Sequence, residues 1–358
     1  ARKDSGEFFT VLLIEAGPEL HNDKRTKQDY KYWTGLFNTD LDWCYYYERQ
    51  KGLNNRYIPA TRGKSTGGST AVNACMWVLG HQDDYDNWER LGAKGWNWET
   101  LRPYFKALES FPEGDPECRG SDGPIKIAES AKNTNIVTDW VEAMGKLGLN
   151  TEGDYNDGEN RGVYVTQQNV GGKKRNDAFS SLIEPLLETH SNLTVVSCAT
   201  THRVLFEGKE ATAVQFYSDG KMHTITASKE IILSAGAIGS PQILMHSGIG
   251  NSKNLKKYGV KVIVDNPAVG SNFMDHIGVS IGLKLKEDAP TENLGAGLSG
   301  TGFGDSTWRK ENETIGGPDI QYIVGVGPLL EAFMNALLIT KFLPFYPPGT
   351  FTGNLFHY

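Results

Sequence analysis

Residues 8–18 read FFTVLLIEAGP, an apolar run that leads directly into Glu15 and then into a glycine and a proline. A near-continuous apolar run of this length is typical of a parallel strand covered on both faces. In dinucleotide-binding folds, an acid at the carboxyl end of such a strand hydrogen-bonds a ribose hydroxyl. The run therefore predicts an α/β fold with Glu15 at the ribose position.

The glycine fingerprint of such folds lies about 20 residues before that acid. Only 14 residues precede Glu15, and Gly6 is the one glycine among them. We therefore expect the first strand and its glycine-rich turn to be missing, and the chain to be a fragment.

Composition excludes several classes of protein. The 358 residues suffice for two domains with substantial cores. A net charge of −7 argues against nucleic acid as the main partner, and the longest basic run, Lys173-Lys174-Arg175, is interpreted as a solvated face. The longest apolar stretch, Phe333–Phe345, is broken by Asn335 and Lys341, so no membrane span is predicted.

The cysteines and histidines predict no metal site. The four cysteines lie far apart and the eight histidines lack metal-ligand spacing. Cys75 and Cys198 are expected in the core, whereas Cys44 and Cys118 could pair in a secreted protein. Localisation stays unassigned, although sequons at Asn192 and Asn312 are compatible with secretion.

Helical patterns occupy the first half of the chain. Residues 83–110 predict two helices separated by a Gly-Ala-Lys-Gly break. A third helix is expected after Asn133 or Thr134, either of which can cap it. Its apolar positions are interpreted as core and are Ile136, Trp140, Met144 and Leu147.

Strand patterns begin at Leu193. Three runs predict an antiparallel meander with a tight turn at Asp219-Gly220; they are Leu193–Phe206, Thr212–Tyr217 and Met222–Ala227. Glu230–Ser234 is expected to be another doubly buried strand. It leads through a glycine turn into a helix with Ser240 as N-cap, Pro241 as first residue and Gly248 past the end, an anion-binding arrangement. Beyond residue 275 the pattern changes to strands, Val279–Leu285 and Ile320–Val326, and glycine-rich loops.

Residues 62–77, RGKSTGGSTAVNACMW, contain the string GKST, which resembles the end of a triphosphate-binding loop. Such a loop needs a glycine five residues before its final Gly-Lys, and Ile58 occupies that position. The remaining glycines permit close backbone approach, while Ser69 and Asn73 offer neutral donors four residues apart. From these residues alone, a flavin wall and a serine-capped glycine turn are equally acceptable.

Several segments together resemble the glucose–methanol–choline (GMC) family of FAD-dependent oxidoreductases. They are GKSTGGSTAVN (63–73), Tyr85-Asp86-x-Trp88, GAIGSPQILMHSGIG (236–250) and VGSNFMDH (269–276). The similarity covers about residues 8 to 330 and is nearest to the insect glucose-dehydrogenase-like branch. The resemblance implies a Rossmann-like, doubly wound FAD domain over residues 1–275, with an antiparallel meander and inserted substrate-cap segments. Residues 276–358 would then begin a truncated substrate domain with an antiparallel sheet.

The resemblance also implies a cofactor site. Glu15 would hold the adenosine ribose, and Thr201 would contact adenine through its backbone. Residues lining the diphosphate and isoalloxazine would be Gly67, Gly68, Ser69, Asn73 and Ala74, with Met76 beside them. The flavin would be closed over by Gly236, Ser240, Asp275 and His276. Thr66 stands where the family usually has an apolar residue, and Met76 where a smaller or polar one is frequent.

The implied activity is oxidation of an alcohol or sugar CH–OH group by hydride transfer to flavin N5, with oxygen or a quinone-like compound as electron acceptor. The family's catalytic base is a C-terminal histidine paired with His or Asn, expected beyond Tyr358, so no catalytic residue is assigned. A flavin-containing lyase, a ligand-binding relative and a non-functional truncated product remain alternatives. Serine-hydrolase chemistry lacks its Gly-x-Ser-x-Gly elbow.

Overall fold

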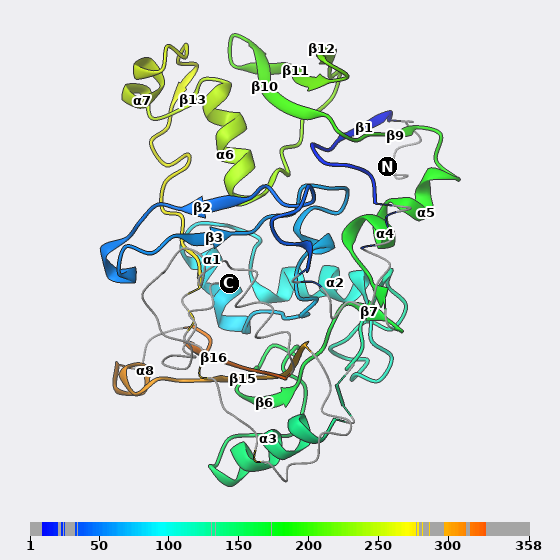
Figure 1. Ribbon diagram of the computed structural model, residues 1–358, viewed down its shortest axis with the longest axis vertical. Coiled ribbons are helices and arrows are strands. Elements are labelled where there is room, and N and C mark those ends of the chain that lie inside the picture. The colour runs from blue at the N-terminus through cyan, green and yellow to red at the C-terminus, as the bar shows by residue number, and fades with distance from the viewer. Residues whose placement is uncertain are drawn as a thin grey trace.

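The computed structural model describes residues 9–20, 23, 25, 33, 35–129, 131–132, 134–172, 174–276, 278, 281, 286, 297–312 and 316–326. Its elements are arranged along one long axis (Figure 1). A three-stranded meander and helices α6 (Gly236–His246) and α7 (Ser252–Lys257) lie at one end. Helix α3 (Asn135–Lys146) and a second sheet lie at the other, with helices α1 (Gln82–Arg90) and α2 (Trp98–Leu108) between. The mixture of helices and strands confirms the α/β class.

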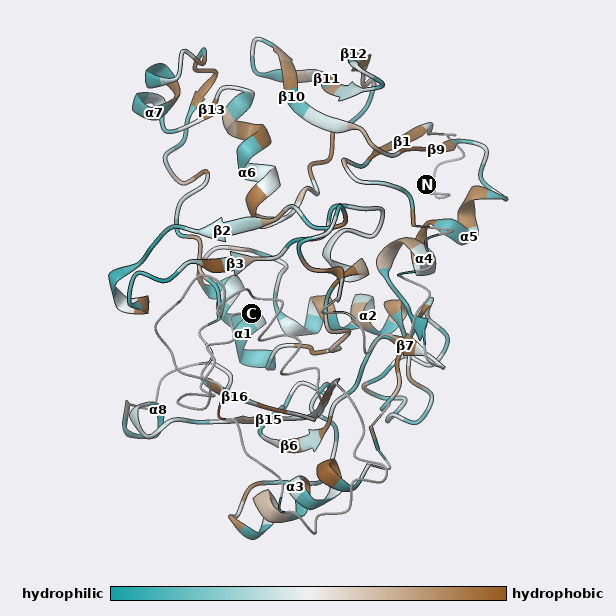
Figure 2. Ribbon diagram, viewed as in Figure 1, coloured by the Kyte–Doolittle hydropathy of each residue, from teal (hydrophilic) through white to brown (hydrophobic). Residues whose placement is uncertain are grey.

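The apolar run that opens the chain forms β1 (Val11–Ile14), which pairs in parallel with β9 (Leu193–Val196). Both strands are predominantly hydrophobic (Figure 2). The predicted parallel strand is therefore confirmed, but it is half-buried rather than covered on both faces. Within the described residues this sheet has two strands, which leaves Val11 38% exposed.

The predicted meander consists of β10 (Thr200–Glu207), β11 (Glu210–Ser218) and β12 (Lys221–Thr226). The tight turn is confirmed, because Asp219 and Gly220 have φ of 50° and 77°. The prediction of a single first strand was wrong: the chain bends at Cys198, with φ of 51°, between the end of β9 and the start of β10. Cys198 is also exposed and not part of the core, since it lies in the bend between β9 and β10.

The predicted strand Glu230–Ser234 is absent, and Ile232 is 75% exposed. A strand needs a neighbour for its ladder hydrogen bonds, and none of the described segments pairs with this run. Helix α6 begins earlier than predicted, at Gly236, so Ser240 and Pro241 lie inside it. The Ser240 hydroxyl instead accepts a hydrogen bond from the Ala235 amide at 2.9 Å. The predicted end is confirmed by Gly248, with φ of 92°.

The two helices predicted between residues 83 and 110 are confirmed as α1 and α2. His81 caps α1 by accepting a hydrogen bond from the Asp83 amide at 3.1 Å, and Asn97 caps α2 in the same way from Thr100 at 2.9 Å. The two helices share a small core in which Tyr85 stacks on Trp98.

Helix α3 begins after Thr134, whereas Asn133 lies outside the described residues. The predicted core stripe is wrong at Leu147, which is 76% exposed because the helix ends before it. Val137 is the residue of α3 that is fully buried.

The second sheet is antiparallel, in the order β16 (Ile320–Val326), β15 (Gly297–Gly304) and β6 (Gly162–Val165). Strand β16 was predicted, whereas the glycine-rich segment was expected to be loop. Close packing explains two of these glycines: a Cβ at Gly300 would lie 2.8 Å from the Trp140 ring, and one at Gly302 would lie 2.6 Å from Val163. The predicted strand Val279–Leu285 is largely outside the described residues.

Short pairs complete the structure. They are β2 (Tyr45–Tyr47) with β3 (Ile58–Ala60), β4 (Glu109–Ser110) with β5 (Ile125–Lys126), β7 (Val170–Gly171) with β8 (Lys174–Arg175), and β13 (Ile249–Gly250) with β14 (Val264–Asp265). The remaining helices are α4 (Ala178–Leu182), α5 (Glu184–Leu187), α8 (Thr307–Asn312) and the 3₁₀ helices Lys51–Leu53 and Gly68–Ala71. In the described part of the chain, every helix is too short or too polar to cross a bilayer; Phe333–Phe345 lies outside it.

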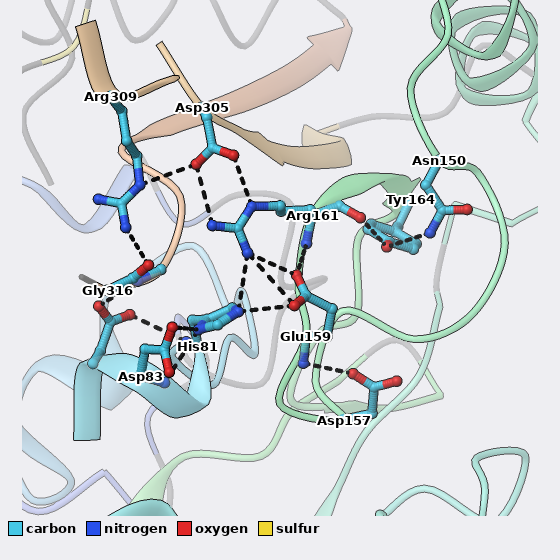
Figure 3. A network of polar contacts seen from close by, with 12 residues as sticks. His81, Asp83, Asn150, Asp157, Glu159, Arg161, Tyr164, Asp305, Arg309 and Gly316 are labelled. Atoms are coloured by element: carbon cyan, nitrogen blue, oxygen red, sulfur yellow. Dashed lines mark hydrogen bonds and ion pairs between the residues drawn. The ribbon is translucent and has the colours of Figure 1, made fainter. Parts of the chain in front are cut away.

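A polar network ties α1 to the second sheet (Figure 3). Arg161 donates to Asp305 at 2.8 Å and to Glu159 at 3.1 Å. His81 contacts Glu159 at 3.0 Å, and Arg309 pairs with Asp305 at 3.1 Å. The segment before β6, the start of α1 and the end of β15 are thereby held together.

Candidate functional site

The glycine segment folds as a tight turn followed by a single 3₁₀ turn, Gly68–Ala71. Gly67 and Gly68 have φ of 90° and 54°, a region that disfavours residues with side chains. The Ser69 hydroxyl accepts a hydrogen bond from the Gly63 amide at 3.2 Å. A Cβ at Gly68 would face open space, so the backbone here is accessible at close range.

The end of β1 lies directly against this segment. A Cβ at Gly17 would stand 1.9 Å from the Lys64 carbonyl oxygen, so only glycine fits there. The Thr66 amide donates to Pro18 at 3.0 Å. The Glu15 carboxylate, which accepts from the Gly17 amide at 2.8 Å, is therefore brought to the glycine segment.

Burial affects both Glu15 and Thr66. Burial raises the pKa of Glu15, and hydrogen bonds from the Gly17 and Ala16 amides oppose that rise only in part. Thr66 is 2% exposed, and its hydroxyl accepts from the Leu20 amide at 3.0 Å. The hydroxyl of Thr66, a departure from the family pattern, is thus used within the protein.

Asn73 follows the 3₁₀ turn and is exposed, whereas Ala74 and Cys75 behind it are buried. The Asn73 side-chain oxygen accepts from Arg175 Nη1 at 2.6 Å and from the Cys75 amide at 3.0 Å. Cys75 has φ of 62°, and burial raises its pKa to about 11, so this thiol is a core group. Met76 continues beside Gln168, to which it forms an isolated β-bridge.

Arg175 is one of the residues of this site that the sequence analysis did not identify. Its run was interpreted as solvated, but Arg175 is 7% exposed, whereas Lys174 is exposed and Lys173 lies outside the described residues. Strand β8 alternates its side chains between two faces, which sends Arg175 inward. The alternation of side chains along a strand could have identified Arg175 as inward-facing, whereas its positive charge suggested an exposed position.

Asp275 is brought to the same region by the β2–β3 hairpin. The Tyr47 hydroxyl donates to its carboxylate, and Arg62 pairs with it at 3.4 Å. Arg62 immediately precedes Gly63, so Asp275 lies near the start of the glycine segment. Burial, helped by the hydrogen bond to Asp275, raises the pKa of Tyr47 to about 12. The exposed His276 joins through its amide, which donates to Asp275 at 2.8 Å.

Thr201 connects to Glu15 by a short path. The Ala199 amide donates to the Glu15 carbonyl oxygen at 2.8 Å, and Thr201 follows in β10 opposite Phe216. Helix α6 is joined to β10, because the Val204 amide donates to the Ser247 hydroxyl at 2.8 Å. The site residues of α6, Gly236 and Ser240, thus connect to the others through β10; no bond between described residues links them directly to the glycine segment.

The residues that meet here suit a dinucleotide and not a metal. They offer neutral amides and hydroxyls, left-handed glycines and a buried arginine. The buried Ser65 hydroxyl, two residues before Gly67, has no hydrogen-bond partner among the described residues. Across the same residues no cluster of three His, Cys, Asp or Glu side chains could hold a metal ion. Cys44 and Cys118 are both free, so the pairing considered for them is not formed.

Comparisons with known protein sequences give matches to one family. A family model described as GMC oxidoreductase matches residues 5–278. Human mitochondrial choline dehydrogenase is 37% identical over 277 residues, which are 76% of this chain and 46% of that protein. The oxygen-dependent choline dehydrogenase of Sinorhizobium fredii is 36% identical over 66% of this chain and 43% of its own. The chain thus spans less than half the length of these curated relatives.

Comparison with solved structures finds oxidases of similar fold. Pyridoxine 4-oxidase from Mesorbium loti superposes with a TM-score of 0.77 at 28% identity, covering 89% of this chain and 62% of that one. A formate oxidase from Aspergillus oryzae, studied for the effect of a mutation on FAD modification, superposes with a TM-score of 0.72 at 27% identity over 85% of this chain and 58% of its own.

Proposed function

This chain belongs to the GMC oxidoreductase family, and we propose that the protein is an FAD-dependent oxidoreductase that acts on the CH–OH group of an alcohol or sugar. The observation that carries the proposal is the contact between Gly17 and Lys64, which sets Glu15 against the glycine segment. A ribose-binding acid and a close-approach backbone are the two features that a dinucleotide cofactor needs at one place.

The chain's residues take the following roles in this proposal. Glu15 accepts a hydrogen bond from the adenosine ribose, and the backbone at Thr201 contacts adenine. Residues of the glycine segment and its continuation line the diphosphate and isoalloxazine: Gly67, Gly68, Ser69, Asn73, Ala74 and Met76. The start of α6, at Gly236 and Ser240, closes over the flavin together with Asp275 and His276.

Bound FAD would supply the redox chemistry by accepting a hydride at N5 from the carbinol carbon. The described residues contribute binding and orientation: neutral donors fix the cofactor, and the tight glycine turn excludes side chains from its face. The base that removes the hydroxyl proton is not assigned to any residue of this chain. Residues 1–275 are proposed as the FAD domain and 276–358 as part of a substrate domain.

The relatives are choline dehydrogenases, and one structural neighbour is a pyridoxine oxidase, so small alcohols are the first substrates to assay. Glucose belongs in the same panel, because a resemblance to the insect glucose-dehydrogenase-like branch is part of this proposal. The electron acceptor is proposed to be oxygen or a quinone-like compound.

The test is anaerobic mixing of the purified protein, expressed from its complete gene, with choline, pyridoxine and glucose in turn. Bleaching of the flavin absorbance by one alcohol, and recovery of the colour with oxygen or a quinone, is the expected result. A flavin that binds but that no alcohol reduces would favour a lyase or ligand-binding relative instead.

A further inference from the structure

Arg175 is a buried cation without a counter-charge at bonding distance. It is 7% exposed, and no carboxylate of a described residue lies within 4.0 Å of its guanidinium. The other deeply buried arginine, Arg119, instead pairs with Glu109 at 2.8 Å and also with Asp154. Burying a charge that has no ion-pair partner in contact is costly, so the buried Arg175 depends on the hydrogen bonds that it makes; Asp177 acts on it only through the longer-range charge interaction.

The printed bonds of Arg175 point to that use. Its Nη1 donates to the Asn73 side-chain oxygen at 2.6 Å and to the Thr70 carbonyl oxygen at 3.0 Å. Both acceptors belong to the 3₁₀ turn of the glycine segment or its immediate continuation. The buried Arg175 side chain therefore holds the glycine segment in place from the protein interior.

The bonds also settle which way the Asn73 amide faces. Its oxygen accepts from both Arg175 and the Cys75 amide, so the oxygen faces the protein. The amide nitrogen finds no acceptor among the described residues, and Asn73 is exposed. Two N–H donors are thus held toward the open side of the turn.

We propose that Arg175 is a positioning residue that locks the Asn73 amide as a hydrogen-bond donor to the bound cofactor. This inference rests on the proposed function, because it takes FAD as the ligand that Asn73 faces. Arg175 acts through Asn73: its Nη1 donates to the Asn73 side-chain oxygen and fixes an orientation that a freely rotating amide would hold only part of the time.

A double-mutant cycle on FAD affinity tests the proposal. Asn73→Ala and Arg175→Met are each expected to weaken FAD binding about tenfold, the size of one well-placed hydrogen bond. The double variant is expected to bind as weakly as Asn73→Ala alone, because the arginine acts through the asparagine. Arg175→Lys retains the charge and one donor and should recover part of the loss. The proposal is overturned if the double variant loses the product of the two single-variant fold-losses in FAD affinity. It is also overturned if Arg175→Met binds FAD as tightly as wild type.

Asn73→Asp distinguishes the role of the side-chain oxygen, which accepts hydrogen bonds within the protein, from the role of the N–H donors. The carboxylate keeps both accepted bonds and gives Arg175 a counter-charge, so the FAD-free protein should unfold at a higher temperature. It removes the N–H donors, so FAD affinity should still fall at least tenfold and the bound flavin's absorbance band should shift. Unchanged affinity and spectrum in Asn73→Asp contradict the assigned orientation.

Lys174→Met is the matched control, because it removes a positive charge from the neighbouring exposed position of β8. It should leave FAD affinity unchanged; a loss equal to that of Arg175→Met would reduce the effect to general charge and overturn the proposal. If the wild-type protein itself binds no FAD, the proposed function fails. If it binds FAD and the cycle is additive, only the role of Arg175 fails.

Discussion

The Gly17 backbone lies so close to Lys64 that a Cβ on Gly17 would stand 1.9 Å from the Lys64 carbonyl oxygen. This contact joins the end of β1 to the glycine segment across 47 positions of sequence, and it brings Glu15 to the site. The obstructing atoms belong to the backbone and cannot rotate away.

Gly17→Ala is therefore expected to separate these two segments. The native state should lose about 3 kcal/mol or more, because overpacking against backbone forces the chain to shift. Thermal unfolding measures the loss, and FAD affinity should fall with it. Gly52→Ala is the matched control, since nothing lies within 4 Å of a Cβ at Gly52. Equal unfolding temperatures for the two variants would contradict the close approach.

Glu15→Gln is expected to change stability and cofactor affinity in opposite directions. Burial raises the pKa of Glu15 above 4.5, so the native state holds the proton more tightly than the unfolded chain does. Stability is therefore lost as the pH rises from about 4 through the raised native pKa. The glutamine cannot ionise, so the FAD-free variant should be more stable than wild type at pH 7.

The same substitution weakens the acceptor offered to the ribose, so FAD affinity should fall about tenfold. Urea unfolding at pH 4 and pH 7 and an FAD titration measure the two effects. Glu19→Gln, at an exposed position nearby, serves as the control. A Glu15→Gln variant with wild-type affinity would remove Glu15 from the cofactor site.

Thr66→Val tests whether the hydroxyl of Thr66 is structural. The valine leaves the Leu20 amide without its acceptor in a buried position, which costs about 1–3 kcal/mol of stability. Thr66→Ser keeps the hydroxyl and should lose less. Chemical denaturation of both variants gives the comparison, and a Thr66→Val variant at least as stable as wild type would show that the hydrogen bond has no net value.

Arg161→Met should weaken the network between α1 and the second sheet. The hydrogen bond from Arg161 holds the pKa of Asp305 below its usual range. A lowered acid pKa adds stability above the unfolded value of about 3.9, and that stability disappears as the pH falls through the native pKa. Because Arg161 is partly exposed, the expected loss at pH 7 is about 1 kcal/mol.

The difference between Arg161→Met and wild type should shrink toward zero as the pH is lowered from 6 to about 3, which urea midpoints at several pH values will follow. Asp305→Asn should show the same pH dependence, and the double variant should be no worse than either single variant. A gap that stays constant with pH would assign the effect to packing of the Arg161 stem.

Local patterns in the sequence predicted much of the fold. Helices α1 and α2 were found because a helical pattern and the Gly-Ala-Lys-Gly break between the two helices are local properties, and the Asp219-Gly220 turn was found because few residues accept its backbone angles. The predictions failed where pairing decides. Glu230–Ser234 has the composition of a strand but no described neighbour to pair with. Leu193–Phe206 divides at Cys198 because its first part pairs with β1 and its second part pairs with β11.

The candidate site was predicted in the same uneven way. Glu15 and the glycine segment carry motifs, so their residues were named before their contact was known. Arg175 was missed because its burial depends on which face of a two-residue strand it occupies, and charge alone gives the opposite expectation. Tyr47 and Arg62 were missed for a related reason: they reach Asp275 from more than 200 positions away, and no local pattern marks them.

We propose that the contact between β1 and the glycine segment forms one wall of an FAD site. The most direct measurement is the visible absorbance spectrum of the purified protein, expressed from its complete gene, before and after addition of FAD and removal of the excess. We expect a flavin band retained at close to one FAD per chain in wild type and lost in Gly17→Ala. A protein that stays colourless after FAD is added would contradict it.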